Sequence, residues 1–328
     1  MADGGAVAWL ERRQIGLYLA AIAAGGSVGV VVPGTSLLEV AIYPVLGLLL
    51  YATFLGVPFA SVGAALRDVR FLLAVLVVNF VFVPAVAFGL SRFVAGEPAL
   101  LFGVLLVLLT PCIDYVIVFS GLAGGASDRL LAAAPLLMVT QVLLLPVYLW
   151  LILGRDGVAA VDVGPFVEAF VVLIVIPLAA AAGTQALAAR YRGGRRLQAG
   201  VLGAMVPLMM ATLFVVVASQ AAAVRSQAAQ LVILLPLYAG YLLLATALGW
   251  FVGTSFGLDV ASRRAVVFSG ATRNSLVVLP LALALPPELA LAPVVVVTQT
   301  LVELIGMVVL VRLVPALVPH AVRERPGT

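Results

Sequence analysis

Apolar runs long enough to cross a lipid bilayer follow one another along almost the whole chain. A membrane-spanning helix needs about 20 mainly apolar residues. Only helices and closed barrels satisfy every backbone N–H and C=O group inside a bilayer. We therefore expect an all-α membrane protein with ten transmembrane helices. The predicted spans are 14–32, 37–58, 71–93, 98–123, 129–154, 164–184, 200–221, 230–253, 261–286 and 290–314.

The composition excludes a soluble globular domain. Hydrophobic residues make up 64% of the chain and charged residues 10%, against about 25% charged residues in a soluble domain. The net charge of +4 comes from arginines in short connections rather than from a basic patch, so we expect no nucleic-acid partner. The single cysteine excludes an internal disulfide and cannot build a structural zinc site, which needs four ligands. We expect no cofactor.

The distribution of arginine predicts the orientation in the membrane. Ten spans place both termini on the same side, and with that side cytoplasmic the inner connections and tails hold fourteen arginines against three outside. Such an excess follows the positive-inside rule, so we expect an integral plasma (inner) membrane protein with both termini cytoplasmic. The inner set is Arg12, Arg13, Arg67, Arg70, Arg129, Arg190, Arg192, Arg195, Arg196, Arg263, Arg264, Arg312, Arg323 and Arg325, and the outer set is Arg92, Arg155 and Arg225.

The predicted spans divide the chain into segments. The first apolar run lacks a small-residue cleavage site and nine more runs follow, so we interpret it as a retained span rather than a signal peptide. The segments are a cytoplasmic N-terminal segment (1–13), a first five-span repeat with span six (14–187), an Arg-rich cytoplasmic loop (188–200), the remaining spans of a second repeat (201–314) and a cytoplasmic tail (315–328).

A short internal repeat supports this division. Residues 134–143 and 292–301 share six of ten identities at an offset of 158, including an Ala-Pro and a Thr-Gln pair. Because five spans is an odd number, two such copies have opposite orientations in the membrane. The sequence therefore predicts two inverted five-helix repeats, an architecture of secondary transporters.

Two predicted spans are interrupted by polar or helix-breaking residues. In the fourth, Pro111 and Cys112 stand near the middle of the apolar run. Proline removes a backbone donor and clashes with the preceding turn, and unwound backbone at membrane depth marks transporter sites. The repeat offset leads to a second polar interruption around Gly270, at residues 269–275. We predict that helices 4 and 9 are discontinuous and cross, with a substrate site at Cys112.

Three charged residues lie inside predicted spans, where a charge is costly, by roughly 2.5–3.5 kcal/mol on insertion scales. Asp114 and Arg273 are open to two interpretations: a structural ion pair that joins the two breaks, or substrate-binding groups. Glu303 has no basic residue nearby in its own span. It is either a proton carrier, a role that Asp114 also fits, or a hydrogen-bonded packing group.

Other polar residues of the same spans complete the candidate substrate site. Thr140 with Gln141, Thr298 with Gln299, and Asn274 offer hydroxyl and amide groups, although such groups are also common between membrane helices. Cys112 taken alone is more often a small buried hydrophobic residue than a ligand, but its position directly after Pro111 shifts the balance towards a ligand.

These motifs resemble the arsenite-efflux permeases of the bile acid:sodium symporter superfamily, over roughly residues 37–314. The resemblance rests on Cys112-Ile113, Leu122-Ala123, Gln141-Val142-Leu143, Asn79 with Pro84, and Val302-Glu303. It implies a core with two crossing discontinuous helices beside a panel of the remaining spans, and a Cys112 thiol that engages arsenite. A single thiol would bind trivalent arsenic weakly and reversibly, which suits a carrier.

The chain also departs from that superfamily. Leu276 stands where an acid is expected, and Pro111 where an arginine is expected. The sodium ligands expected near Ser269 and Arg273, and near Val116 and Ile117, are missing. The leading expectation is proton-linked arsenite efflux. The alternative is an organic-anion carrier of the bile-acid type, without sodium coupling, in which Arg273 holds the anion. The expected partners of the protein are a small-molecule or oxyanion substrate, protons and the lipid bilayer.

Overall fold

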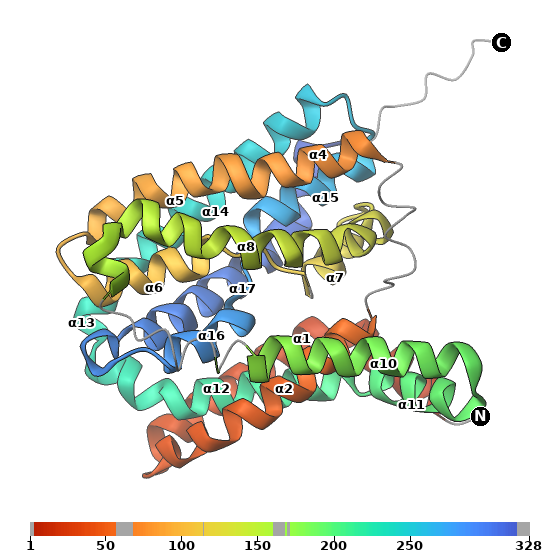
Figure 1. The fold of residues 1–328 in the computed structure, drawn as a ribbon, viewed down its shortest axis with the longest axis horizontal. Coiled ribbons are helices and arrows are strands. Elements are labelled where there is room, and N and C mark those ends of the chain that lie inside the picture. The colour runs from red at the N-terminus through yellow and green to blue at the C-terminus, as the bar shows by residue number, and fades with distance from the viewer. Residues whose placement is uncertain (1–2, 57–67, 114, 160–167, 169–170, 320–328) are drawn as a thin grey trace.

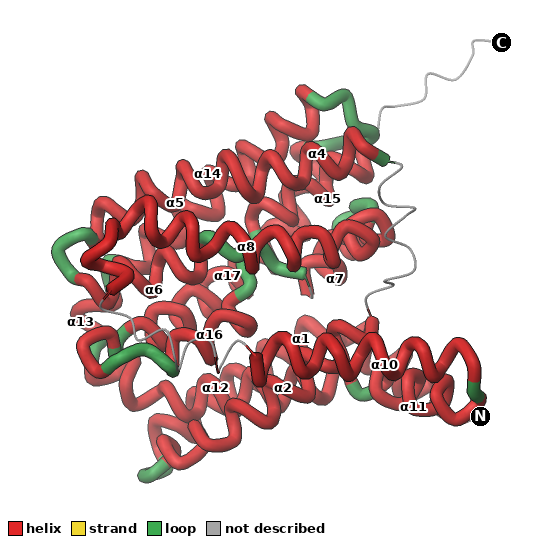
Figure 2. The backbone as a smooth tube through the Cα atoms, viewed as in Figure 1, coloured by secondary structure: helices red, strands yellow, loops and turns green. Residues whose placement is uncertain are grey.

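The computed structural model describes residues 3–56, 68–113, 115–159, 168 and 171–319. The regular structure of these residues is helical, as Figures 1 and 2 show. The helices form two groups. The first, called the panel below, contains α1 (Asp3–Val31), η1 (Thr35–Leu38), α2 (Glu39–Gly56), η5 (Val171–Val175), α10 (Ile176–Arg190), α11 (Arg192–Gly203) and α12 (Met205–Ser226).

The second group, called the core below, packs beside the panel (Figure 1). The two groups meet chiefly where α12 contacts α17 and where α16 contacts α2. The core contains α4 (Val69–Val77), η3 (Val78–Phe82), α5 (Val83–Ser91), η4 (Arg92–Val94), α6 (Pro98–Leu108), α7 (Tyr115–Leu122), α8 (Ser127–Ala159), α14 (Leu234–Ser255), α15 (Val260–Ala271), α16 (Ser275–Leu283), η6 (Pro287–Leu289) and α17 (Ala292–Leu317), and α13 (Ala228–Leu231) joins it to the panel.

Six helices of the described residues are long and apolar enough to cross a membrane, or seven if the two halves of α1, bent by 73°, count as one span. The prediction of an all-helical membrane protein is confirmed to this extent. Ten spans and two inverted repeats stay predictions. The predicted fourth and ninth spans are absent from this count because each consists of two short helices, α6 with α7 and α15 with α16.

Helices extend across three of the predicted segment boundaries, and the division into segments stays a prediction. Within residues 188–200, α10 continues to Arg190 and α11 begins at Arg192. The N-terminal segment 1–13 belongs largely to α1, which begins at Asp3. The helix α17 reaches Leu317, inside the predicted tail, and residues 320–328 lie outside the described residues.

The two interruptions lie close to where the sequence predicts them. The helix α6 ends at Leu108 and α7 begins at Tyr115, so the chain around Pro111 is not helical. The second interruption is shorter, 272–274, because α15 continues to Ala271. Gly270, predicted as the break, therefore lies inside α15, where an added Cβ would approach Val78 Cγ1 to 2.6 Å. This glycine allows α15 to pack closely against η3.

The segment η3 is a single π-helical turn between α4 and α5. Pro84 follows it and has no N–H group to donate to the carbonyl oxygen of Phe80. The hydroxyl group of Tyr148, on α8, donates to that oxygen at 2.6 Å. Such π turns occur frequently at functional sites, and this one carries Asn79 into the centre of the core.

A polar cluster joins three helix ends at one end of the core. Arg129 forms ion pairs with Asp68 and Asp259, both at 3.0 Å, so the connections that carry these residues lie on the same side of the protein. Partial burial would raise the pKa of Asp259, but hydrogen bonds from Ser262 and Arg129 outweigh it and lower the pKa. Exposed ion pairs of this kind contribute at most about 1 kcal/mol each.

Candidate functional site

The two interruptions are joined by an antiparallel bridge between Pro111 and Arg273. The N–H group of Cys112 donates to the carbonyl oxygen of Thr272 at 3.2 Å, and the N–H group of Asn274 donates to that of Thr110 at 2.9 Å. Each unwound segment thus supplies hydrogen-bond partners to backbone groups of the other. Buried backbone N–H and C=O groups need such partners. The chain segments meet in this way at a crossing point between α6, α7, α15 and α16.

Glu303, on α17, closes one side of this crossing. Its Oε2 atom accepts a hydrogen bond from the backbone N–H group of Arg273 at 2.8 Å and another from Gln299. Its Oε1 atom lies 2.6 Å from the hydroxyl oxygen of Tyr115, which lies 3.0 Å from the carbonyl oxygen of Arg273. Glu303 is 1% exposed, and its carboxyl group is hydrogen-bonded directly to the unwound backbone at Arg273.

The side chain of Arg273 turns into the core and is fully buried. Its Nη2 atom donates to Asn79 Oδ1 at 2.7 Å and to the carbonyl oxygens of Ser269 and Gly270 at 2.7 and 2.9 Å. Its Nη1 atom donates to the carbonyl oxygen of Leu108 at 3.3 Å. The ligands found among the described residues are thus neutral oxygen atoms. The predicted partner Asp114 lies outside the described residues, so the ion pair stays a prediction.

Asn79 links the π turn to this arginine. Its Nδ2 group donates to the carbonyl oxygen of Val75 at 2.9 Å and to Ser269 Oγ at 2.8 Å, which leaves Oδ1 pointing at Arg273. Both donors and the acceptor of the amide are used, so its orientation follows from the contacts. Asn79 thus positions Arg273 rather than offering free groups to a solute.

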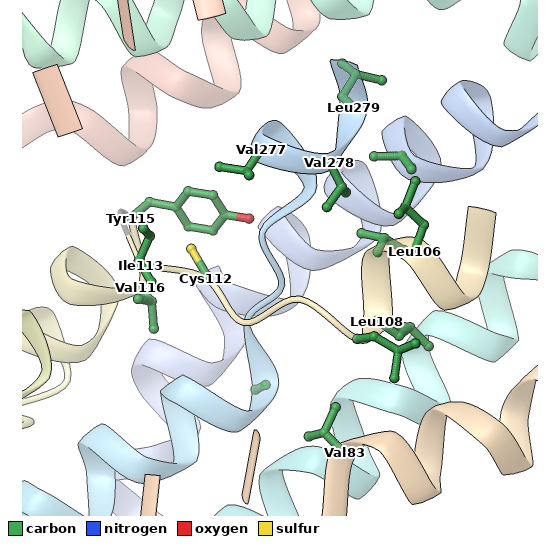
Figure 3. Packing of buried hydrophobic residues seen from close by; sticks show 14 of the residues in the cluster. Val83, Leu106, Leu108, Cys112, Ile113, Tyr115, Val116, Val277, Val278 and Leu279 are labelled. Atoms are coloured by element: carbon green, nitrogen blue, oxygen red, sulfur yellow. The ribbon is translucent and has the colours of Figure 1, made fainter. Parts of the chain in front are cut away.

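Cys112 lies in the unwound segment between the bridge and α7. Its side chain is fully buried, and Figure 3 shows its sulfur beside the ring of Tyr115, with Val277 of α16 beyond. The thiol therefore lies where α7 and α16 begin.

Several buried polar atoms near the crossing have no hydrogen-bond partner among the described residues. They include Asn274 Nδ2 and Ser275 Oγ at the start of α16, and Gln299 Oε1 next to Glu303. Gln141 Oε1, on α8, is another. More than nine in ten buried polar groups find a partner, so each such atom calls for an additional one, such as water or a ligand. The first three adjoin the crossing, which makes it the candidate binding site.

The remaining predicted site residues differ in their contacts and burial. The hydroxyl group of Thr298 donates to Val294 in its own helix at 2.8 Å, and Thr140 is partly exposed while Gln141 is buried. Gln299, Arg273 and Asn274 lie with Cys112 around the crossing. Whether any of them binds a solute stays a prediction.

Sequence reasoning missed the roles of Tyr115, Ser269 and Tyr241. The hydroxyl group of Tyr241 donates to the carbonyl oxygen of Gly270 at 2.7 Å, and its ring lies 5.7 Å from the Arg273 guanidinium carbon. The repeat did contain a signal for Tyr115. At the repeat offset of 158, position 115 corresponds to position 273, and Tyr115 is hydrogen-bonded to Arg273 in the structure. Ser269 and Tyr241 had no comparable signal, since their contacts depend on helix packing.

Long apolar helices around a buried polar crossing of unwound segments define an integral membrane protein of the transporter class. Residues 43–228, more than half of the chain, match the Sodium Bile acid symporter family. The chain belongs to this family. A comparison with curated proteins found no match. Family membership identifies the chain as a transmembrane transporter of a small-molecule solute.

Proposed function

We propose that this transporter exports arsenite in exchange for protons, with Cys112 as the solute-binding thiol. One observation carries the proposal: the only cysteine of the chain lies fully buried in the unwound segment, directly after the bridge residue Pro111. Asn274 and Ser275 supply polar atoms without described partners at the adjoining start of α16. A soft thiol beside hydroxyl and amide groups matches the needs of As(OH)₃, a thiophilic centre that carries hydroxyl groups.

Binding by one thiol keeps the solute exchangeable. The thiol displaces one hydroxyl group of arsenous acid as water, forming a single sulfur–arsenic bond, and water reverses the step. Two or three thiols would hold arsenic far more tightly and slow its release. The single Cys112 therefore suits a carrier.

Glu303 is the proposed proton carrier, with Asp114 as the alternative. The hydroxyl group of Tyr115 has one hydrogen but faces two acceptors, Glu303 Oε1 at 2.6 Å and the Arg273 carbonyl oxygen at 3.0 Å. An ionised Glu303 accepts this hydrogen. A protonated Glu303 donates to Tyr115 instead, which frees the tyrosine to donate to Arg273. Protonation would thus change the hydrogen bonding of the unwound backbone next to Cys112.

The test is arsenite export from arsenic-sensitive cells that express the chain. Wild type should lower internal arsenic, whereas Cys112→Ser, which keeps the size of the side chain but not its affinity for arsenic, should be expressed equally and lose the effect. Cys112→Ala provides a second thiol-free variant. A thiol-blocking reagent should inactivate the wild type, and arsenite should protect it. Equal arsenic levels in wild-type, Cys112→Ser and empty-vector cells would refute the assignment.

A second candidate, transport of an organic anion, is favoured by the name of the matched family. The Nη groups of Arg273 are already hydrogen-bonded within the core, so the anion would instead use the start of α16. There Asn274 Nδ2 has no described partner, and the N-terminus of a helix favours an anion. Flux of a bile acid into proteoliposomes, lost in Asn274→Ala and retained in Cys112→Ser, would support this function over arsenite export.

A further inference from the structure

The guanidinium group of Arg273 sits in a cage of neutral oxygen atoms. Nη2 carries two hydrogens but faces three oxygen atoms within 2.9 Å, from Asn79, Ser269 and Gly270. The carbonyl oxygen of Leu108 adds a fourth oxygen near Nη1. The ion pairs formed among the described residues involve Arg129 rather than Arg273. The four oxygen atoms do not outnumber the five N–H donors of the guanidinium group, and Nε has no partner among the described residues. Three of the four converge on Nη2 alone, however, and this convergence also suits a bound cation.

Such a cage at membrane depth is the arrangement that an inorganic cation needs. Carbonyl and amide oxygens can replace the hydration shell of an ion inside a protein. The family that the chain belongs to is named for sodium symport. In this chain the oxygen atoms that converge between η3, α6 and α15 are already hydrogen-bonded to a cation of the protein itself, the guanidinium group of Arg273. A positive charge at this depth is costly unless it is matched by acceptors, and the cage supplies them.

We infer that Arg273 is a resident cation, which fills the site that a metal cation such as Na⁺ would otherwise occupy at the crossing. The transporter consequently needs no Na⁺ there. The charge stays in place through every transport cycle and joins α6 to α15, because Leu108 belongs to one and Ser269 to the other. This inference rests on the oxygen cage and on family membership, and not on the identity of the solute.

The inference is tested by thermal unfolding of the purified protein in NaCl and in KCl at equal ionic strength. Wild type and Arg273→Lys, which both keep a cation in the cage, should unfold at the same temperature in the two salts. Arg273→Ala leaves the oxygen atoms without donors and should be less stable in KCl, because buried unpaired acceptors are costly. Na⁺ should raise its unfolding temperature by a few degrees, since a ligand that binds only the native state stabilises it.

Two controls make the result specific to the cage. Arg273→Ala combined with Asn79→Leu removes one oxygen ligand and should abolish the response to Na⁺. Arg264→Ala removes another buried arginine, whose acceptors include the carbonyl oxygens of Ala123, Pro315 and Val318. These oxygen atoms lie at the C-terminal ends of α7 and α17 and not at the crossing, so this variant should lose stability equally in both salts.

Stabilisation of the wild type by Na⁺ over K⁺ would overturn the inference, as would a folded Arg273→Ala protein that does not respond to Na⁺. If Arg273→Ala does not yield folded protein, Arg273→Gln takes its place in the same comparison, because it keeps a long side chain without the charge. These measurements use no arsenite. A failure of arsenite export would therefore not bear on the inference about Arg273, and a response of the wild type to Na⁺ would not bear on the arsenite proposal.

Discussion

Substitution by alanine should change the stability of the protein in opposite directions at two glycines of the same helix. Gly249 and Gly240 both lie within α14, Leu234–Ser255. A Cβ added at Gly249 would lie 2.6 Å from Val267 Cα and 3.2 Å from the carbonyl oxygen of Val266, both backbone atoms of α15. A Cβ added at Gly240 meets nothing within 4 Å. The comparison therefore isolates the close contact between α14 and α15.

The expected magnitude follows from these distances. Carbon atoms pack at about 3.5–4.0 Å, so alanine at position 249 forces α15 away by about 1 Å. Overpacking of this kind costs about 1–3 kcal/mol. Replacing a mid-helix glycine by alanine contributes about 0.5–1 kcal/mol of stability at either position, and this gain cancels in the comparison. Gly249→Ala should thus be less stable than Gly240→Ala by about 1–3 kcal/mol.

The assay is thermal unfolding in detergent, followed by far-UV circular dichroism. At about 2 °C per kcal/mol for a large chain, Gly249→Ala should unfold about 2–6 °C below Gly240→Ala, and Gly240→Ala at or slightly above the wild type. Transport should also fall in Gly249→Ala, because α15 carries the chain into Arg273. Equal unfolding temperatures for the two variants would show that the α14–α15 contact is looser than its geometry indicates.

Two further predictions concern the site and the orientation. Tyr115→Phe removes the hydroxyl group that connects Glu303 to the Arg273 carbonyl oxygen. The substitution should lower the free energy of unfolding by about 1.5–3 kcal/mol, as for a hydrogen bond to a charged group, and should flatten the pH dependence of transport in proteoliposomes. An unchanged pH profile would show that Tyr115 takes no part in proton coupling. A reporter inserted at Tyr191, the joint between α10 and α11, and one fused after Arg325 should both read cytoplasmic, and an external signal from either would contradict the ten-span orientation.

Much of the site could be located from the sequence because its signals are local. The apolar runs indicate a membrane protein through the cost of unpaired backbone in lipid, and Pro111 marks a helix interruption through its missing N–H group. The repeat offset carried that interruption to the second segment, where α15 ends at Ala271 and α16 begins at Ser275. The exact boundaries of the interruptions were less predictable. Gly270 shows why, because a glycine can allow close helix packing instead of ending a helix.

The sequence by itself thus determined the class of protein, the approximate places of both interruptions and the presence of Glu303 and Arg273 inside apolar spans. Only the tertiary structure decided what those charges contact. Arg273 meets Leu108 and Asn79, and Glu303 meets Tyr115, across more than 160 residues of chain in each case. Periodicity and propensity describe neighbours along one helix, whereas the partners of a buried charge depend on which helices pack together and at what height.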